Sequence, residues 1–235
     1  MQDLTLIAFD ADDTLWQNET QFRMTQSRIE SLLADFTDPA QLHDRLLAAE
    51  RRNLGHYGFG VKGFMLSMIE TAIEVTEGRV EARVIAEILA AGREMLELPV
   101  DLLPHAEATV RTMAQTHQVI VITKGDLLDQ ERKIAQSGLG EVFHGVEIVS
   151  NKTDAAYSAI FTRHGHRPES CMMVGNSMKS DVLPALAAGA HGVHVPHGLT
   201  WELERANPPP PSPRFHTITD LSALPDLVNN LNGPL

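Results

Sequence analysis

The feature that most constrains this chain is an apolar segment near its N-terminus that ends abruptly in acidic residues. Residues 4–9 are almost all apolar, and residues 10–14 read Asp-Ala-Asp-Asp-Thr. An apolar run of this kind is typical of a parallel strand that is buried on both faces. Because a buried strand cannot carry Asp10 inward without a partner, we expect the acidic cluster just beyond its C-terminal end. Ligands bind at that edge in open α/β sheets.

The rest of the chain divides into a helical stretch and an alternating stretch. Residues 17–98 show helical periodicity and no convincing strand, whereas strands alternate with helices from residue 103 onward. We therefore expect an α/β fold in which residues 1–16 and 99–235 form a Rossmann-like core with a parallel sheet. Residues 17–98 are expected to form an inserted helical domain.

The residue patterns also give expected element bounds. Helices in the inserted stretch are expected over 20–34, 39–53, 61–75 and 80–98, with a glycine-containing connection at 54–60. Strands after residue 103 are expected at 118–122, 146–149, 172–174, 193–195 and 215–218.

Charge and composition exclude several functional classes. The formal net charge of −12 argues against a nucleic-acid partner, although a small anionic substrate is compatible if a metal ion and a few lysines reverse the field locally. The chain has no apolar run of membrane-spanning length and no secretory pattern at its start, so we expect a cytoplasmic protein without a membrane partner. The single Cys171 adjoins Met172 and is read as a core residue. Helical periodicity alone leaves the oligomeric state open.

Polar residues follow the apolar strands at four places. Asp10 and Asp12 follow the first strand, Thr123 the second and Lys152 the third, and the fourth leads into Asn176 and Asp181. Their order resembles the motifs of the haloacid dehalogenase superfamily of phosphohydrolases. The first motif of that family, D-x-D-x-T, is matched by Asp10, Asp12 and Thr14, and residues 175–181 resemble its last motif, G-D-x-x-x-x-D, with Asn176 in place of the first acid.

The resemblance covers nearly the whole chain and implies Mg²⁺-dependent hydrolysis of a small phosphorylated metabolite. It implies that Asp10 is the nucleophile and that Asp12 is the general acid and base at the leaving oxygen. Thr123 and Lys152 would bind the phosphoryl oxygens. Asp10, the backbone carbonyl of Asp12 and Asp181 would bind Mg²⁺.

Elementary electrostatics supports the same set of groups. A phosphate monoester is an anion, so a carboxylate nucleophile faces repulsion that must be removed before in-line attack. Mg²⁺ prefers oxygen ligands, Lys152 would supply a fixed positive charge, and Thr123 would donate a hydrogen bond to a phosphoryl oxygen.

Some residues keep more than one interpretation. The amide oxygen of Asn176 can coordinate the metal or hold a metal-bound water, but it brings no negative charge, so Mg²⁺ affinity is expected to be lower. Lys133 competes with Lys152 for the role of active-site lysine, although residues 130–133 read more simply as a solvated helix face. Asp13 receives no assigned role, and Trp16 is read as a packing residue.

Three other functions remain open. A phosphomutase of the same family would use the same two aspartates, and a dehalogenase would use the same fold without magnesium, although the acid at Asp12 counts against it. A phosphate- or protein-binding module without activity is favoured only by Asn176. In the family, a helical insertion in this place closes over the site, so residues 17–98 are expected to be a cap that sets specificity.

Overall fold

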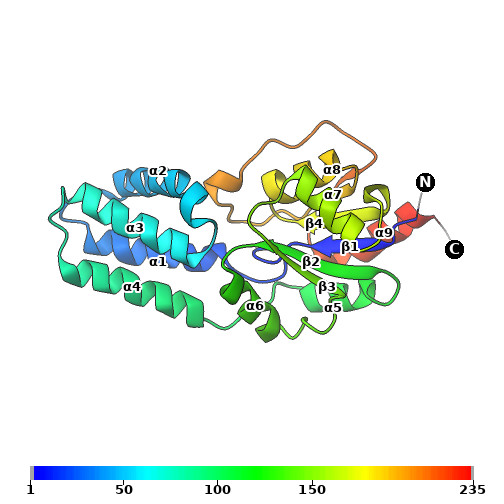
Figure 1. Ribbon diagram of the computed structural model, residues 1–235, viewed down its shortest axis with the longest axis horizontal. Coiled ribbons are helices and arrows are strands. Elements are labelled where there is room, and N and C mark those ends of the chain that lie inside the picture. The colour runs from blue at the N-terminus through cyan, green and yellow to red at the C-terminus, as the bar shows by residue number, and fades with distance from the viewer. Residues whose placement is uncertain (1–2, 234–235) are drawn as a thin grey trace. The chain divides into compact units, whose positions relative to one another are not determined.

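The computed structural model of the protein describes residues 3–233 (Figure 1). The chain forms two compact units. The α/β unit contains the chain up to residue 19, residues 100–124 and the chain from residue 131 onward, and the helical unit contains residues 20–99 and 125–130. Within the described residues no helix is both long and apolar enough to cross a membrane.

The α/β unit is organised around a parallel sheet. Within residues 3–233 the sheet has six strands in the order β3-β2-β1-β4-β5-β6, so β1 lies in its centre. The strands are β1 (Leu6–Phe9), β2 (Gln118–Lys124), β3 (Gly145–Val149), β4 (Cys171–Gly175), β5 (His191–His194) and β6 (Phe215–Thr217). All neighbouring pairs run parallel, which confirms the expected α/β fold.

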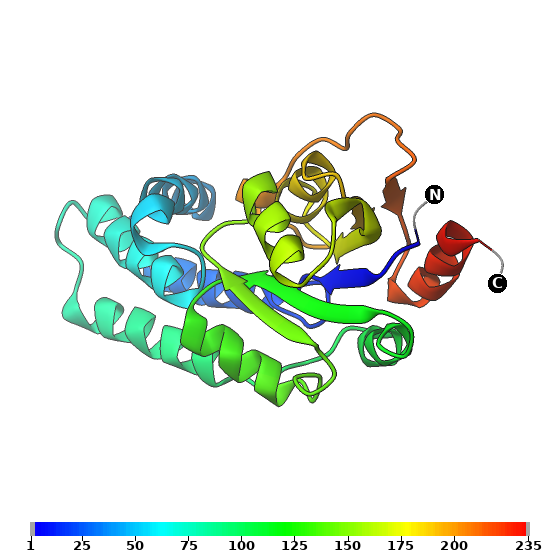
Figure 2. The ribbon, with the colours of Figure 1, turned by 45° about the vertical axis from the view of Figure 1, so that its right-hand side comes forward.

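Helices cover both faces of this sheet (Figures 1 and 2). Alternate residues of β1 point to opposite sides: Ile7 and Phe9 pack in one apolar cluster, and Leu6 and Ala8 pack in the other. The first cluster contains residues of α5 (Ala106–Met113), α6 (Leu127–Gln136) and α9 (Leu224–Asn232), and the second contains residues of α7 (Asp154–Arg163) and α8 (Leu183–Ala187). Because apolar side chains are needed on both faces, the central strands read as continuous apolar runs.

The register of the sheet brings the polar strand ends to one edge. Phe9 of β1 is level with Val121 of β2 and with Val174 of β4. Asp10 follows Phe9 directly, Thr123 is the last but one residue of β2 and lies two positions after Val121, and Asn176 follows β4. Parallel pairing therefore gathers residues that lie more than a hundred positions apart in the sequence.

The helical unit has an apolar core of its own. Its main helices are α1 (Glu19–Leu32), α2 (Pro39–Tyr57), α3 (Val61–Val75) and α4 (Ala82–Glu97). Side chains from all four helices pack together, among them Ile29, Leu46, Phe64 and Ile88. Within each helical segment the buried apolar residues recur at three- and four-residue spacings, as in Val61, Phe64 and Met68. The helices could therefore be predicted from the sequence to within a few residues.

The connection expected at residues 54–60 is shorter than predicted. Residues 54–57, expected in a connection, continue α2, whose last backbone bond runs from Gly58 N–H to the carbonyl of Leu54. Gly58 then ends the helix with a positive φ of 73°, a conformation that glycine adopts without strain. The expected interruption is therefore confined to residues 58–60.

The unit boundaries also differ from the expected domain bounds. Residues 17–19 group with the α/β unit, and residues 125–130 group with the helices. Within the helical unit, the carboxylate of Asp126 accepts the backbone N–H of Lys62 at 3.2 Å and pairs with its ammonium at 3.1 Å. That the helical unit acts as a cap stays a prediction.

Candidate active site

The turn after β1 holds the acidic cluster in a tight backbone conformation. Asp10 N–H donates to the carbonyl of Val174, which continues the pairing of β1 with β4. Leu15 N–H donates back to the carbonyl of Ala11, and Asp13 N–H donates to the carbonyl of Trp16. Asp13 adopts a left-handed φ of 61°. The turn therefore places Asp10 at the strand end while the chain reverses beyond it.

Lys152 lies between two buried carboxylates. Its Nζ is 2.5 Å from Asp10 Oδ1 and 2.7 Å from Asp181 Oδ1. The Lys152 side chain is only 1% exposed and that of Asp181 is fully buried. The structure thus brings together three residues predicted from separate motifs, and places Lys152 rather than Lys133 beside Asp10.

Burial and mutual repulsion perturb these groups. Burial, followed by repulsion from Asp181, raises the pKa of Asp10 from 3.8 to about 7, although Lys152 acts in the opposite direction. Burial would lower the pKa of Lys152, but Asp10 and Asp181 outweigh it and raise that pKa above its usual value. Two carboxylates therefore share one ammonium, and a further cation would be stabilising here.

Asp181 is positioned by an irregular turn after β4. Residues Met178–Val182 form a π-helical turn, a feature that is common at functional sites. Asp181 Oδ2 accepts the backbone N–H of Ser177 at 2.9 Å. A side-chain carbon at Gly175 would overlap the Asp181 carboxylate, so this position requires glycine.

Thr14 connects the ends of β1 and β4. Its hydroxyl is 3.0 Å from Asp10 Oδ2 and 3.3 Å from Asn176 Oδ1, and it accepts the backbone N–H of Asn176 at 3.0 Å. Because a hydroxyl has one proton, the shorter distance favours donation to Asp10. The oxygens of Asp10 and Asn176 are therefore held on either side of one buried hydroxyl group.

Asp12 is held by two donors. Trp16 Nε1 donates to Asp12 Oδ1 at 2.7 Å, and Lys133 Nζ donates to the same oxygen at 3.0 Å. Lys133 Nζ also donates to Asn18 Oδ1 at 2.9 Å. The interpretation of Lys133 as part of a solvated helix face is therefore wrong, because its side chain is only 9% exposed and lies in the site.

Sequence reasoning missed the contacts of two residues with Asp12. Trp16 is almost fully buried, as a packing residue should be, but its indole N–H also binds a carboxylate. Lys133 directly precedes Ile134 on α6, and both residues are buried. The apolar neighbour at 134 was the one sign in the sequence that the Lys133 side chain lies on the inner face of this helix. The charged residues at 131 and 132 obscured it.

Thr123 lies buried at the end of β2, next to the central strand. Its hydroxyl donates to the carbonyl of Lys124 at 3.3 Å. Lys124 Nζ in turn contacts Ser180 Oγ at 2.8 Å and Glu204 Oε1 at 2.7 Å. Glu204 Oε2 accepts the hydroxyl proton of Ser177 at 2.6 Å. This network ties the end of β2 to the turn that carries Asp181.

The Lys124–Glu204 pair carries a stability prediction. Burial would raise the pKa of Glu204, but Lys124 and the hydrogen bonds from Ser177 and Ser180 outweigh it and hold that pKa below 4.5. Glu204→Gln should therefore lower the free energy of unfolding by about 2 kcal/mol at neutral pH, because Lys124 loses its ionic partner. A carboxyl whose folded-state pKa is depressed stabilises the fold above its unfolded-state value, and this contribution is lost as the pH falls.

Urea unfolding of both proteins from neutral pH to about pH 4 measures this difference. The gap between wild type and Glu204→Gln should shrink below pH 4.5. Glu107→Gln is the matched control, since Glu107 pairs with Arg111 on an exposed helix surface and should change stability by at most about 0.5 kcal/mol. A gap that stayed constant with pH would show that ionisation of Glu204 does not stabilise the fold.

Asp13, which had no expected role, anchors the chain just before α1. Its Oδ1 accepts the backbone N–H groups of Asn18 at 2.9 Å and Glu19 at 3.0 Å. Burial raises its pKa to about 6, although these two hydrogen bonds act in the opposite direction. Its carboxylate therefore serves as a helix cap within the site.

Histidines on β5 and β6, and the single cysteine, have structural contacts. His191 stacks on His216, and His194 Nε2 donates to the backbone carbonyl of Asn176 at 3.1 Å. Cys171 is buried in the sheet, and burial raises the pKa of its thiol to about 12, which agrees with its interpretation as a core residue.

The available oxygens fit a hard divalent cation. Lys152 Nζ contacts a carboxylate oxygen of both Asp10 and Asp181. The Thr14 hydroxyl contacts both Asp10 Oδ2 and Asn176 Oδ1. Within residues 3–233 no three His, Cys, Asp or Glu side chains form a metal-binding group. Mg²⁺, however, commonly uses one or two carboxylates with waters and substrate oxygens, so an amide and the Asp12 carbonyl could complete this set.

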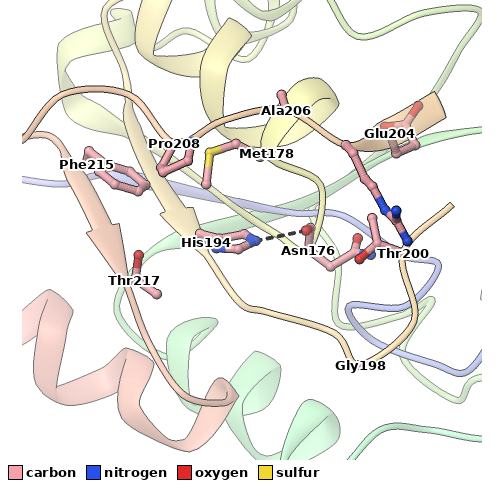
Figure 3. A pocket seen from close by; sticks show the side chains of 11 residues that line it. Asn176, Met178, His194, Gly198, Thr200, Glu204, Ala206, Pro208, Phe215 and Thr217 are labelled. Atoms are coloured by element: carbon pink, nitrogen blue, oxygen red, sulfur yellow. Dashed lines mark hydrogen bonds between the residues drawn. The ribbon is translucent and has the colours of Figure 1, made fainter. Parts of the chain in front are cut away.

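A pocket of about 590 Å³ adjoins Asn176 within the α/β unit (Figure 3). Met178, His194 and Phe215 lie around it, and Thr217 lines it from β6. Its lining contains Asn176 but none of Asp10, Asp12, Thr123 or Lys152. The pocket is therefore a neighbour of the carboxylate cluster rather than the place where the cluster would act.

Comparison with known proteins identifies the family. Residues 4–189 match the profile of the haloacid dehalogenase-like hydrolases. A haloacid dehalogenase-like family hydrolase from Xanthomonas campestris is 41% identical, with 98% of this chain and 93% of that chain covered and a TM-score of 0.88. The chain therefore belongs to the haloacid dehalogenase-like hydrolases. A search of curated proteins finds no match.

More distant structures share the fold but differ in their described activities. A predicted phosphoglycolate phosphatase from Haemophilus somnus is 17% identical, covers 97% of this chain and 100% of its own, and has a TM-score of 0.66. A 2-haloacid dehalogenase from Pseudomonas syringae is 18% identical, covers 97% and 99%, and has a TM-score of 0.61. At these identities the likeness concerns the fold alone.

Proposed function

We propose that this hydrolase is a Mg²⁺-dependent phosphatase that acts on a small phosphorylated metabolite through an aspartyl-phosphate at Asp10. The observation that carries the proposal is a second carboxylate, Asp12, two residues after the candidate nucleophile. A halide leaves as a stable anion, whereas an alkoxide or phenoxide leaves more readily when an acid protonates it. A proton donor beside Asp10 therefore suits a phosphate ester better than a carbon–halogen bond.

The proposed reaction has two steps. Asp10 attacks phosphorus, the bond to the ester oxygen breaks, and Asp12 gives that oxygen a proton. A water molecule then attacks the phosphorus of the aspartyl-phosphate and gives its proton to Asp12. This hydrolysis releases inorganic phosphate and restores the Asp10 carboxylate. Lys152 would hold Asp10 and stabilise the phosphoryl oxygens, and Thr123 would donate to one of them.

Mg²⁺, when bound, would neutralise the phosphate charge that repels Asp10. Asp10, Asp181, Asn176 and the backbone carbonyl of Asp12 are the proposed ligands. The selection of the substrate by the helical unit and a cytoplasmic location stay predictions from the sequence.

The proposed metal ligands predict opposite effects for two substitutions. Asp181→Asn removes a negative charge, so the Mg²⁺ concentration that gives half-maximal activity should rise by about tenfold or more. Asn176→Asp adds a charge where Thr14 already holds an oxygen, so that concentration should fall. Both are measured by hydrolysis of p-nitrophenyl phosphate over a Mg²⁺ titration.

A second readout does not need turnover. Mg²⁺ that binds the folded state raises the melting temperature, so the shift at a fixed Mg²⁺ concentration should be larger for Asn176→Asp and smaller for Asp181→Asn than for wild type. Asp226→Asn, an exposed aspartate on α9, is the matched control. Activity that persists in a chelator, or identical Mg²⁺ shifts in all four proteins, would exclude the metal site.

A dehalogenase is the second candidate. A 2-haloacid dehalogenase shares the fold, and Asp10, held by Lys152, could also attack a carbon atom. Halide release from 2-chloropropionate, measured beside phosphate release, separates the two. Inactivity on a panel of phosphate esters together with halide release would favour the dehalogenase. A phosphomutase would move phosphate within a sugar phosphate, and inactivity in all these assays would favour a binding module.

A further inference from the structure

We propose that Lys133 positions Asp12 for proton transfer, which makes it a positioning residue of the reaction proposed above. The inference rests on that function. It concerns residues that all belong to the α/β unit, and it gives a task to a lysine that the sequence motifs do not include.

The first support is the contact itself. Lys133 Nζ lies 3.0 Å from Asp12 Oδ1, and Trp16 Nε1 lies 2.7 Å from the same oxygen. An aspartate side chain rotates about two bonds, so a single contact would leave its orientation variable. Two donors from different directions fix one oxygen and thereby define where the other oxygen points.

The second support is that Lys133 is itself held in place. Its neighbour Ile134 is 5% exposed and packs in the apolar core, which fixes the rotation of α6 about its axis. Lys133 Nζ also donates to Asn18 Oδ1, and Asn18 is anchored because its backbone N–H donates to Asp13. The position of the Lys133 ammonium is therefore fixed, and its hydrogen bond restricts the orientation of the Asp12 carboxylate.

The third support is the cost of this arrangement. A nearly buried lysine loses hydration that its ion pair only partly repays, and replacing such pairs by apolar residues is often neutral for stability. Stability alone therefore gives little reason to place an ammonium here. Orientation of a proton-transferring carboxylate gives a reason, because efficient transfer needs the donor within hydrogen-bond reach of the leaving oxygen.

The test compares two phosphate esters that differ in their need for an acid. Nitrophenolate leaves readily without a proton, whereas the phenolate of phenyl phosphate leaves better when it is protonated. The value of kcat/KM includes only steps up to departure of this first product. For Lys133→Met, kcat/KM should fall by about 10- to 100-fold with phenyl phosphate and by about threefold or less with p-nitrophenyl phosphate.

Three variants separate positioning from a purely structural role. Lys133→Arg keeps a cation that can donate to Asp12, so it should recover a large part of the phenyl phosphate activity. Trp16→Phe removes the other donor and should show the same dependence on the leaving group. Arg111→Met, which removes an exposed cation from α5, should leave both kcat/KM values unchanged.

A double-mutant cycle completes the test. In an Asp12→Asn background, Lys133→Met should cause no further loss with phenyl phosphate, because its effect acts through the missing carboxylate. If Lys133→Met does not fold, as judged by its thermal transition, the comparison rests on Trp16→Phe and Lys133→Arg.

The outcomes distinguish this inference from the proposed function. Equal losses with both esters, or the same loss with and without Asp12, would overturn positioning by Lys133 while leaving the phosphatase intact. A wild-type protein that hydrolyses neither ester, nor any other phosphate ester in a wider panel, would overturn the proposed function and this inference with it.

Discussion

Asp10→Asn is expected to lower kcat for p-nitrophenyl phosphate by at least about 10⁴-fold, because the variant loses the proposed nucleophile. An amide in the same place keeps the shape of the side chain, so the loss would be chemical. Steady-state release of nitrophenol measures the effect, and mass spectrometry checks that the asparagine has not reverted by deamidation. Asp226→Asn, an exposed carboxylate on α9, is the control and should retain wild-type activity.

The same variant should remain folded. Burial and Asp181 raise the pKa of Asp10 to about 7 in the metal-free protein. A carboxyl with a raised pKa holds its proton more tightly in the folded state, so the stability that it contributes is lost as the pH rises from about 4 to 7. The stability of Asp10→Asn should therefore depend less on pH than that of wild type in this range when a chelator is present.

Turnover of Asp10→Asn within tenfold of wild type would exclude Asp10 as the nucleophile.

The second large effect is expected for Asp12→Asn, which should lower steady-state turnover by about 10²- to 10⁴-fold. With p-nitrophenyl phosphate, loss of Asp12 should slow the second step, in which it acts as a base, far more than the first step, in which it acts as an acid. Departure of nitrophenolate needs little help from an acid, whereas hydrolysis of the aspartyl-phosphate still needs a base. The variant should therefore release about one nitrophenol per active site in a rapid burst and then turn over slowly.

Rapid-mixing measurements of nitrophenol release detect such a burst, and intact-protein mass spectrometry detects the attached phosphoryl group. Asp44→Asn, an exposed carboxylate on α2 of the helical unit, should show no burst and no loss of activity. An Asp12→Asn protein that turned over slowly without a burst would contradict the role of Asp12 as the base of the second step.

Family membership and chemical function stand on different observations. The sequence profile and the similar structure from Xanthomonas campestris establish a haloacid dehalogenase-like hydrolase. That family fold is shared by a predicted phosphatase and by a dehalogenase among the more distant structures. The proposal that the substrate is a phosphate ester rather than a haloacid therefore rests on Asp12 and on the oxygens of Asp181 and Asn176, which are proposed metal ligands near Asp10.

Much of the fold could be predicted from the sequence because its signals are local. The central strands are buried on both faces and read as apolar runs, and the helices of the inserted unit bury one face at regular spacings. The motif residues Asp10, Thr123, Lys152 and Asp181 could be placed at strand ends for the same reason. Bounds were less accurate where a helix continued through a glycine, as α2 does through Gly55.

The contacts within the site depended on tertiary structure. Lys133 stands in a charged segment whose neighbours suggest a solvated surface, and only the packing of α6 turns its side chain toward Asp12. Glu204 shows the same limitation, since it binds Ser177, a polar partner that local sequence does not indicate.

The sequence by itself determined which residue types stand at the ends of the strands, because strand burial and motif spacing are written along the chain. Only the tertiary structure decided how those residues share charge. Lys152 bridges Asp10 and Asp181, and Lys133 holds Asp12, because parallel pairing and helix packing bring distant segments within hydrogen-bond reach. These ion pairs join residues that are 29 to 142 positions apart and leave no periodic signal in the sequence, so they could be seen only in the folded chain.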